Sequence, residues 1–377
     1  MSDSAPGIPP GALSRAAGIA QHIAHEYLTP DVDRKRTTWG ACLARLRCMT
    51  FLGYHASHEQ LPPSALLEAV VEAERVGFDG AFSADHLAPW TPQQGHSGNT
   101  IAWIGAALAR TRFSIGSIST PGQRYHPVVA AHVTATLAEM FPGRYFAALG
   151  SGELLNEHVT GDPWPSKDER TARLGESVDV MRRLLRGERV THEGRVTVHD
   201  ARLWSLPDTP PPLMATAVSP QTARWAATWA DGLVTVGTDP DDVGDLVDAY
   251  RDAGGTGPAC LQVHIALAES RRDALDLAKH QWAHAPVTPP EAWDIAQPEE
   301  FLARAGGVDD DEIQQQVVVG TTGDIGAFAD RLATLVGDTF DRVYLHDVSQ
   351  DQAGFLRGPA PDLLRALRDR LGTWSPA

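Results

Sequence analysis

The sequence is poor in cysteine and in long apolar runs, and each of these two shortages excludes a class of protein. Three cysteines in 377 residues do not make a disulfide framework or a recognisable zinc pattern. No apolar run approaches the roughly 20 residues that span a bilayer. The N-terminus also lacks the basic start and apolar core of a signal peptide. These absences make a cytoplasmic protein without a membrane segment the expectation.

Positive charge is also scarce. Thirty-two Lys and Arg residues stand against 48 Asp and Glu, which gives a net charge of −16. Such a chain is repelled by nucleic acid and by anionic membrane surfaces. We therefore expect a small molecule as the partner, with neither nucleic acid nor a membrane.

Residues 1–48 differ from the rest of the chain. They open with a Pro- and Gly-rich stretch over residues 6–11 and carry a charge cluster over residues 31–36. We interpret them as a poorly ordered extension with one short helix over residues 13–27. Because Met49 directly precedes the first strand-like segment, a mis-assigned start is an alternative. The functional domain is expected over residues 49–377.

From Met49 onward, short apolar runs alternate with amphipathic ones. The strand-like runs are Thr50–Tyr54, Gly80–Ser83, Phe113–Ser119, Tyr145–Leu149, Leu213–Ala217, Leu233–Val236, Leu261–Ala268 and Arg342–His346. A helical pattern follows each of them, and the last one covers residues 350–371. Eight strand-plus-helix units predict an α/β protein with a closed (β/α)8 TIM barrel. A doubly wound open sheet is the alternative, but no early GxGxxG turn supports it.

Two segments interrupt this alternation. Residues 189–206 alternate polar and apolar side chains around Glu193-Gly194, which predicts a hairpin laid across the barrel. Residues 286–316 contain Pro289-Pro290 and an Asp-rich run, and they indicate an insertion beside the barrel mouth.

The stretch Ser83–Trp90 carries the clearest chemical signal. Asp85 and His86 emerge where the second strand ends, which is where TIM barrels place catalytic groups, and Trp90 follows four residues later. A proton-transfer group beside an aromatic wall suits chemistry on a flat redox ring. The alternative is an Asp-His pair that caps a strand beside a core Trp.

Three other strand ends are polar. Ser117–Pro127 follows the third strand, and Gly150-Ser151-Gly152-Glu153 follows the fourth. Glu153 can be an acid, a hydrogen-bond acceptor or a helix N-terminal charge. Ser219-Pro220 reads as a helix start that either binds a phosphate or only caps its helix. His55, His58 and Glu59 lack the HExxH order of zinc proteases, so we expect no metal site.

Several of these strings resemble the luciferase-like flavin- and F420-dependent oxidoreductases. The matching strings are Gly77-Phe78-Asp79 through Trp90, Phe141–Arg144, Gly150–Glu157 and Ala230-Asp231-Gly232. The resemblance is nearest to the sugar-phosphate branch, the F420-dependent glucose-6-phosphate dehydrogenases. It implies a TIM barrel, usually a homodimer, that binds a flavin or deazaflavin at the strand carboxyl ends.

The resemblance also implies residue roles. His86 would abstract a substrate hydroxyl proton, and Trp90 and Glu153 would stabilise the intermediate or donate a proton. A non-proline cis peptide would join Ser117 and Ile118. The implied cofactor contacts are Asp85, Ser117, Ile118, Ser151, Gly152, Asn156, Ala217, Val218 and Ser219.

The chain departs from the sugar-phosphate branch at the residues that hold the phosphate. The Lys-His pair of that branch aligns with Ala292-Trp293, and a further basic residue falls among Gln314–Gln316. A third, a lysine, aligns near Arg224, which keeps only the charge. With the other cations lost, little neutralises a phosphate dianion, so we expect a substrate without phosphate.

The cofactor stays open between FMN and F420. Val218-Ser219 replaces a Gly-Gly turn, and the strings Gly53–Glu59 and Gly122–Pro127 are shared with a subgroup thought to use FMN. A net charge of −16 gives the acidic tail of F420 no attraction, so FMN is slightly favoured. The expected function is a monooxygenase or a dehydrogenase. The alternatives are a metal-dependent TIM-barrel hydrolase and a non-catalytic flavin-binding barrel.

Overall fold

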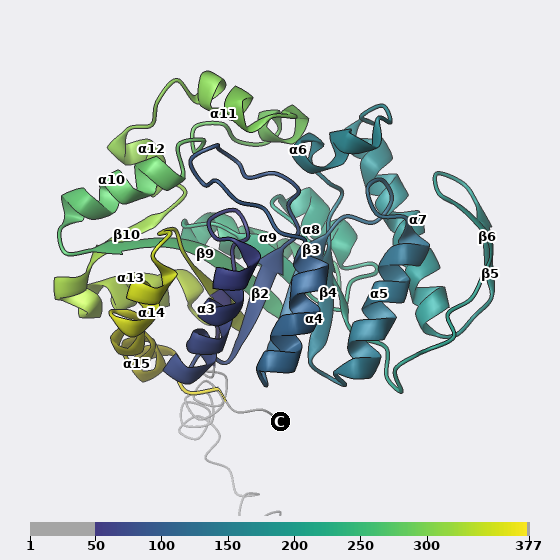
Figure 1. Ribbon diagram of the computed structural model, residues 1–377, viewed down its shortest axis with the longest axis horizontal. Coiled ribbons are helices and arrows are strands. Elements are labelled where there is room, and N and C mark those ends of the chain that lie inside the picture. Colours follow the sequence, from purple (N-terminus) through teal and green to yellow (C-terminus); the bar gives the residue numbers. More distant parts are fainter. Residues whose placement is uncertain (1–49, 375–377) are drawn as a thin grey trace, which may run out of the picture. The chain divides into compact units, whose positions relative to one another are not determined.

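The computed structural model describes residues 50–374, and the predicted N-terminal extension lies outside the described residues. Eight parallel strands pair in the order β1-β2-β3-β4-β7-β8-β9-β11, and β11 pairs back with β1 to close a barrel (Figure 1). The strands are β1 (Phe51–His55), β2 (Gly80–Ala84), β3 (Ser114–Ser119), β4 (Tyr145–Leu149), β7 (Leu213–Thr216), β8 (Leu233–Val236), β9 (Ala259–Ala268) and β11 (Arg342–Asp347). The predicted (β/α)8 barrel is confirmed.

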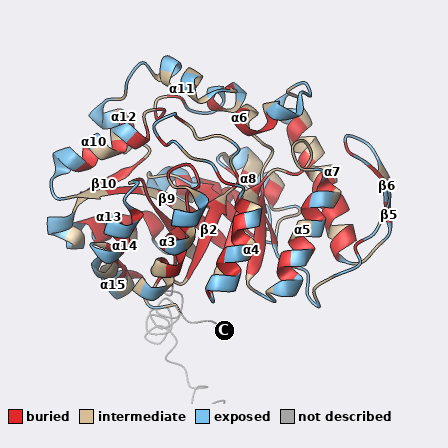
Figure 2. Cartoon of the chain, viewed as in Figure 1, coloured by how far each residue is buried: buried red, intermediate tan, exposed pale blue. Residues whose placement is uncertain are grey.

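Helices cover the outside of this barrel. They are α3 (Pro63–Val76), α4 (Thr100–Arg110), α5 (Pro127–Met140), α7 (Lys167–Leu185), α8 (Pro220–Ala226), α9 (Pro240–Asp252), α10 (Arg271–Gln281), α13 (Ile325–Val336), α14 (Gln352–Arg357) and α15 (Ala360–Leu371). Their inner faces are buried against the strands and their outer faces are exposed (Figure 2). None of the helices between residues 50 and 374 is both long and apolar enough to cross a membrane.

The barrel interior is filled by large side chains that depend on glycine neighbours. Phe146 and Tyr344 are both buried inside the barrel. A Cβ at Gly116 would lie 2.1 Å from the Phe146 ring, and one at Gly53 would lie 2.2 Å from the Tyr344 ring. Glycine on one strand therefore makes room for an aromatic ring on the next. The filled interior leaves the strand carboxyl ends as the place for a cavity.

The insertion after α10 lies over the mouth of the barrel (Figure 1). It contains the short helices η2 (Glu291–Asp294), α11 (Pro298–Ala305) and α12 (Asp310–Gln314). Trp164, in the segment after β4, donates a hydrogen bond from Nε1 to Asp294 Oδ1 at 2.7 Å. On the same side, α6 (Leu154–Glu157) and η1 (His158–Thr160) border the mouth.

Three features of the fold differ from the sequence-based prediction. The short strand β10 (Val318–Thr321) was not expected; it pairs with the end of β9, followed by η3 (Thr322–Asp324). The helix expected over residues 350–371 is two helices, because Gly358-Pro359 interrupts it. The hairpin β5 (Val190–Glu193) and β6 (Thr197–Ala201) exists, but it lies beside α5 and α7 and not across the barrel.

Candidate active site

A cavity of about 340 Å³ opens at the carboxyl ends of the strands, within the size range of small-molecule sites. The sequence-predicted residues that line it are Asp85, His86, Trp90, Ile118, Ser151, Gly152, Glu153, Asn156, Ala217 and Val218. They lie at or after the ends of four strands, β2, β3, β4 and β7. The barrel brings them together as expected.

Ser117 and Ser219 do not line this cavity. Ser117 precedes Ile118 on β3, and its Oγ lies 2.7 Å from the Tyr145 hydroxyl in the buried layer behind the strand. Side chains alternate along a strand, so only one of these two neighbours faces inward. Ser219 Oγ accepts a hydrogen bond from Thr222 N at 3.3 Å and caps α8.

The cis peptide expected between Ser117 and Ile118 is also absent. Among residues 50–374 the only cis peptide is Pro289–Pro290. Ser117 and Ile118 both sit in regular parallel register with β2 and β4, and regular strands are built from trans peptides.

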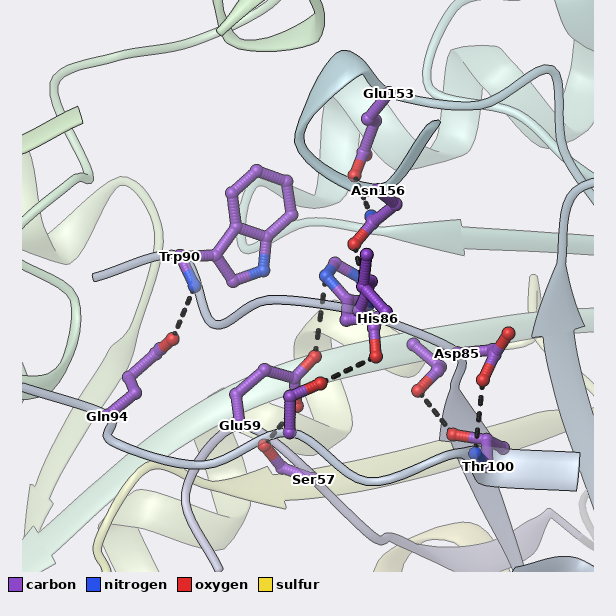
Figure 3. A network of polar contacts seen from close by, with 12 residues as sticks. Ser57, Glu59, Asp85, His86, Trp90, Gln94, Thr100, Glu153 and Asn156 are labelled. Atoms are coloured by element: carbon purple, nitrogen blue, oxygen red, sulfur yellow. Dashed lines mark hydrogen bonds and ion pairs between the residues drawn. The ribbon is translucent and has the colours of Figure 1, made fainter. Parts of the chain in front are cut away.

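His86 is the central polar group of the cavity (Figure 3). Its Nδ1 lies 3.6 Å from Glu59 Oε1, and Glu59 Oε2 accepts a hydrogen bond of 2.6 Å from Ser57 Oγ. The Nε2 atom of His86 has no partner among the described residues. An imidazole with a carboxylate behind it and a free nitrogen in front is the arrangement of a general base.

Trp90 forms an aromatic wall beside His86, with ring centroids 5.1 Å apart. Its indole stacks on His284 at 5.3 Å with an interplanar angle of 5°. The ring of Phe301, in the insertion, packs edge-to-face against Trp90 with 5.4 Å between the ring centroids. The insertion therefore packs directly on the wall of the cavity.

Glu153 lies above His86 in the view of Figure 3, and Asn156 links Glu153 to the loop that carries His86. Asn156 donates from Nδ2 to Glu153 Oε2 at 3.4 Å and accepts at Oδ1 from Leu87 N at 2.8 Å. Burial is the main cause that raises the pKa of Glu153 above its usual value. Glu153 thus keeps a proton at a higher pH than an exposed glutamate does.

We expect Glu153→Gln to be more stable than the wild type at pH 8 and equally stable at pH 4. An acid whose pKa is raised on folding stabilises the fold below its unfolded pKa, and that contribution is lost as the pH rises through the folded pKa. Glutamine stays neutral and does not suffer this loss. Urea unfolding at both pH values measures the difference. A stability difference between Glu153→Gln and the wild type that is the same at both pH values would contradict a raised pKa of Glu153.

Asp85 lines the cavity, but one of its carboxylate oxygens accepts a hydrogen bond from the protein and the other forms an ion pair. Oδ1 accepts a hydrogen bond from Thr100 N at 3.0 Å, and Oδ2 lies 2.9 Å from Arg124 Nη2. Arg124 also approaches Glu157, with 3.5 Å between Nε and Oε1. All three side chains are nearly or fully buried. This ion network joins the loops after β2, β3 and β4.

Most of the lining is apolar or neutral, and acidic side chains outnumber basic ones. Within residues 50–374 the lining contains the carboxylates of Glu59, Asp85, Glu153 and Glu157, whereas Lys167 is its one Lys or Arg side chain. The Nζ of Lys167 donates to Ser151 Oγ at 2.8 Å and lies 4.7 Å from the Trp293 ring centroid. The aligned positions Ala292, Trp293 and Gln316 line the cavity without charge. Arg224 is exposed on α8 and does not reach the lining.

Sequence reasoning missed several lining residues. The sequence suggests Glu59 only as a metal ligand, and residues 50–374 contain no group of three His, Cys, Asp or Glu that could hold a metal. The others were not singled out: Gln94, Lys167, Gln262, His264, His284 and His346. A polar residue within an apolar run, such as His264 between Val263 and Ile265, was the available signal.

A closed barrel with an imidazole, an indole and a carboxyl group around its cavity is compatible with an enzyme that holds a flat redox ring. The chain belongs to the luciferase-like monooxygenase family, whose model matches residues 46–342. It is therefore a flavin- or F420-dependent oxidoreductase that acts on a small molecule. This membership sets aside the metal-dependent hydrolase.

Individual relatives agree with this assignment. The chain is 36% identical over 330 residues to an F420-dependent glucose-6-phosphate dehydrogenase of Microbacterium testaceum (strain StLB037), covering 84% of this chain and 97% of the relative. A solved F420-dependent secondary alcohol dehydrogenase, in complex with an F420-acetone adduct, is 29% identical with a TM-score of 0.78. It covers 85% of this chain and 100% of its own. A Streptomyces bottropensis monooxygenase, 24% identical with a TM-score of 0.62, shares the fold; the match covers 84% and 99% of the two chains.

Proposed function

We propose that the protein oxidises a neutral secondary alcohol to a ketone with F420 as the hydride acceptor. The observation that carries this proposal is the shortage of cations in the cavity: among the described residues, Lys167 is the one Lys or Arg side chain of its lining. A sugar phosphate dianion would find little positive charge to neutralise it there, whereas an uncharged alcohol needs none. The similarity to a secondary alcohol dehydrogenase supports the same substrate class.

The residues around one side of the cavity suit a flat ring cofactor. Ile118 offers an apolar contact, and Gly152 also lines the cavity. Ala217 and Val218 continue this wall, and Asn156 supplies an amide. The sequence alone favoured FMN slightly, but the F420 enzymes among its relatives shift our preference to F420.

The side chains would divide the work as follows. A bound F420 would supply the hydride acceptor for the carbinol carbon, so that the hydride leaves as the C–H bond breaks and the proton is left to the protein. His86 Nε2 takes the hydroxyl proton, and Glu59 stabilises the resulting imidazolium from behind. Trp90, against which Phe301 packs, would keep water from the reacting carbon. Glu153 holds a proton at the edge of the cavity.

Cofactor titration followed by turnover tests this proposal. Quenching of cofactor fluorescence should show at least about tenfold tighter binding of F420 than of FMN. With F420 bound, cyclohexanol should be oxidised with a kcat/KM at least about 100-fold above that for glucose 6-phosphate, because the phosphate lacks charged partners. Tighter binding of FMN would overturn the cofactor, and a preference for the sugar phosphate would overturn the substrate. Binding without turnover of any alcohol would indicate a non-catalytic barrel.

A further inference from the structure

Two histidines on neighbouring strands contact each other at the cavity. His264 on β9 is paired in register with His346 on β11, and their Nδ1 atoms are 2.9 Å apart. Burial lowers the pKa of His264 to about 3 and places that of His346 well below its usual value. Both rings are therefore neutral near pH 7, and each carries a single N–H.

Gln60 decides which nitrogen carries that proton. Its Nε2 donates to the carbonyl oxygens of Val348 and Ser349, which can only accept. Its Oε1 consequently faces His346 Nε2 at 2.6 Å, so this nitrogen must be the N–H. The Nδ1 of His346 is then an acceptor, and the Nδ1 of His264 must donate to it. The Nε2 of His264 is left as an unprotonated acceptor.

This acceptor opens onto the cavity. His264 lines the cavity, and its Nε2 has no hydrogen-bond partner among the described residues. His264 Nε2 is also not among the fully buried side-chain atoms that lack a hydrogen-bond partner, whereas His284 Nδ1 is. At Nε2 the His264 ring can therefore accept a hydrogen bond but cannot donate one.

Two neutral amides extend the same surface. Gln262 precedes His264 by two residues on β9 and so shares its face of the strand. Gln316, at the end of the insertion, also lines the cavity. Neither side chain has a hydrogen-bond partner among residues 50–374. In the ring of strands β9 stands opposite β3, which carries Ile118, so this surface lies across the cavity from the proposed cofactor wall.

We propose that His264, with Gln262 and Gln316, forms a neutral subsite that binds a second hydroxyl or amine N–H of the substrate, distant from the reacting carbon. The proposal rests on the proposed function, because there the reacting hydroxyl gives its proton to His86 and leaves His264 to accept from another group. Gln60 and His346 are positioning residues that fix the tautomer. The substrate class is thereby narrowed from simple alcohols to diols and amino alcohols.

Binding of matched probes tests the subsite. The probes are 1,2-, 1,3- and 1,4-cyclohexanediol and their monomethyl ethers, which keep one hydroxyl and lose the second donor. At least one diol should bind about tenfold more tightly than its ether, as one hydrogen bond allows. His264→Phe should abolish this preference. The matched control His284→Phe, another cavity histidine, should keep the preference even if it weakens both ligands.

The tautomer gives a second, independent measurement. In protein labelled with ¹⁵N-histidine, long-range ¹H–¹⁵N spectra should show His264 protonated at Nδ1 and bare at Nε2. Gln60→Met should release this restriction, and both tautomers should then appear. A wild-type protein with Nε2 protonated, or with no preference for any diol, would overturn the proposal. Both measurements can be made without cofactor, so they separate failure of the subsite from failure of the proposed function.

Discussion

Replacing His86 by alanine should lower kcat by about 10²–10⁴-fold while cofactor affinity stays within a few-fold. The free Nε2 of His86 is the unpartnered ring nitrogen beside Trp90, and Glu59 stands behind the ring to stabilise its charged form. Alanine removes the proton acceptor but leaves the wall residues Ile118 and Val218 in place. The loss should therefore fall on the chemical step and not on binding.

Single-turnover reduction of bound cofactor measures that step, and fluorescence titration measures affinity. His132→Ala is the control, because His132 is exposed on α5 outside the cavity and its removal should change neither quantity. Glu59→Gln should fall between the two, since it keeps the shape of the side chain but loses the negative charge. Full activity in His86→Ala would remove His86 from the mechanism.

Much of the fold and part of the site were predictable from local patterns. Buried parallel strands appear as short apolar runs, and the residues that follow them lie at one end of a barrel. This is why Asp85-His86, Ser151-Gly152 and Ala217, which the sequence places after strand ends, all line the cavity. The barrel converts a position in the chain into a position in space, so the end of a strand is informative by itself.

The remaining features of the site depend on the direction in which each side chain points and on contacts between segments that are distant in the sequence. Ser117 and Ile118 are adjacent, and only the strand pleat decides which of them reaches the cavity. Glu59 gains its role from a contact with His86, 27 residues away. The tautomer of His264 depends on Gln60, which is more than 200 residues away in the sequence. Local patterns in one sequence carry no information about such pairings.

The Asp85–Arg124–Glu157 network is the feature whose loss should cost the most stability. Arg124 Nη2 contacts the Asp85 carboxylate at 2.9 Å and also donates to the Asp85 carbonyl at 2.8 Å. The backbone N of Arg124 donates to Glu157 Oε2 at 2.7 Å. Burial raises the pKa of Glu157, because burial disfavours the charged form of a carboxyl group. One guanidinium thus compensates two buried carboxylates.

Arg124→Met should lower the free energy of unfolding by about 3–5 kcal/mol, because it leaves both carboxylates buried without a counter-charge. Arg110→Met is the matched control: Arg110 makes two hydrogen bonds to Glu68 at 3.2 and 3.3 Å, but both side chains are exposed, so the loss should stay below about 1 kcal/mol. Chemical unfolding at pH 7 measures both variants. Adding Asp85→Asn and Glu157→Gln to Arg124→Met should recover much of the stability, since neutral amides need no counter-charge. Equal losses for Arg124→Met and Arg110→Met would show that this network does not stabilise the loops that carry His86 and Glu153.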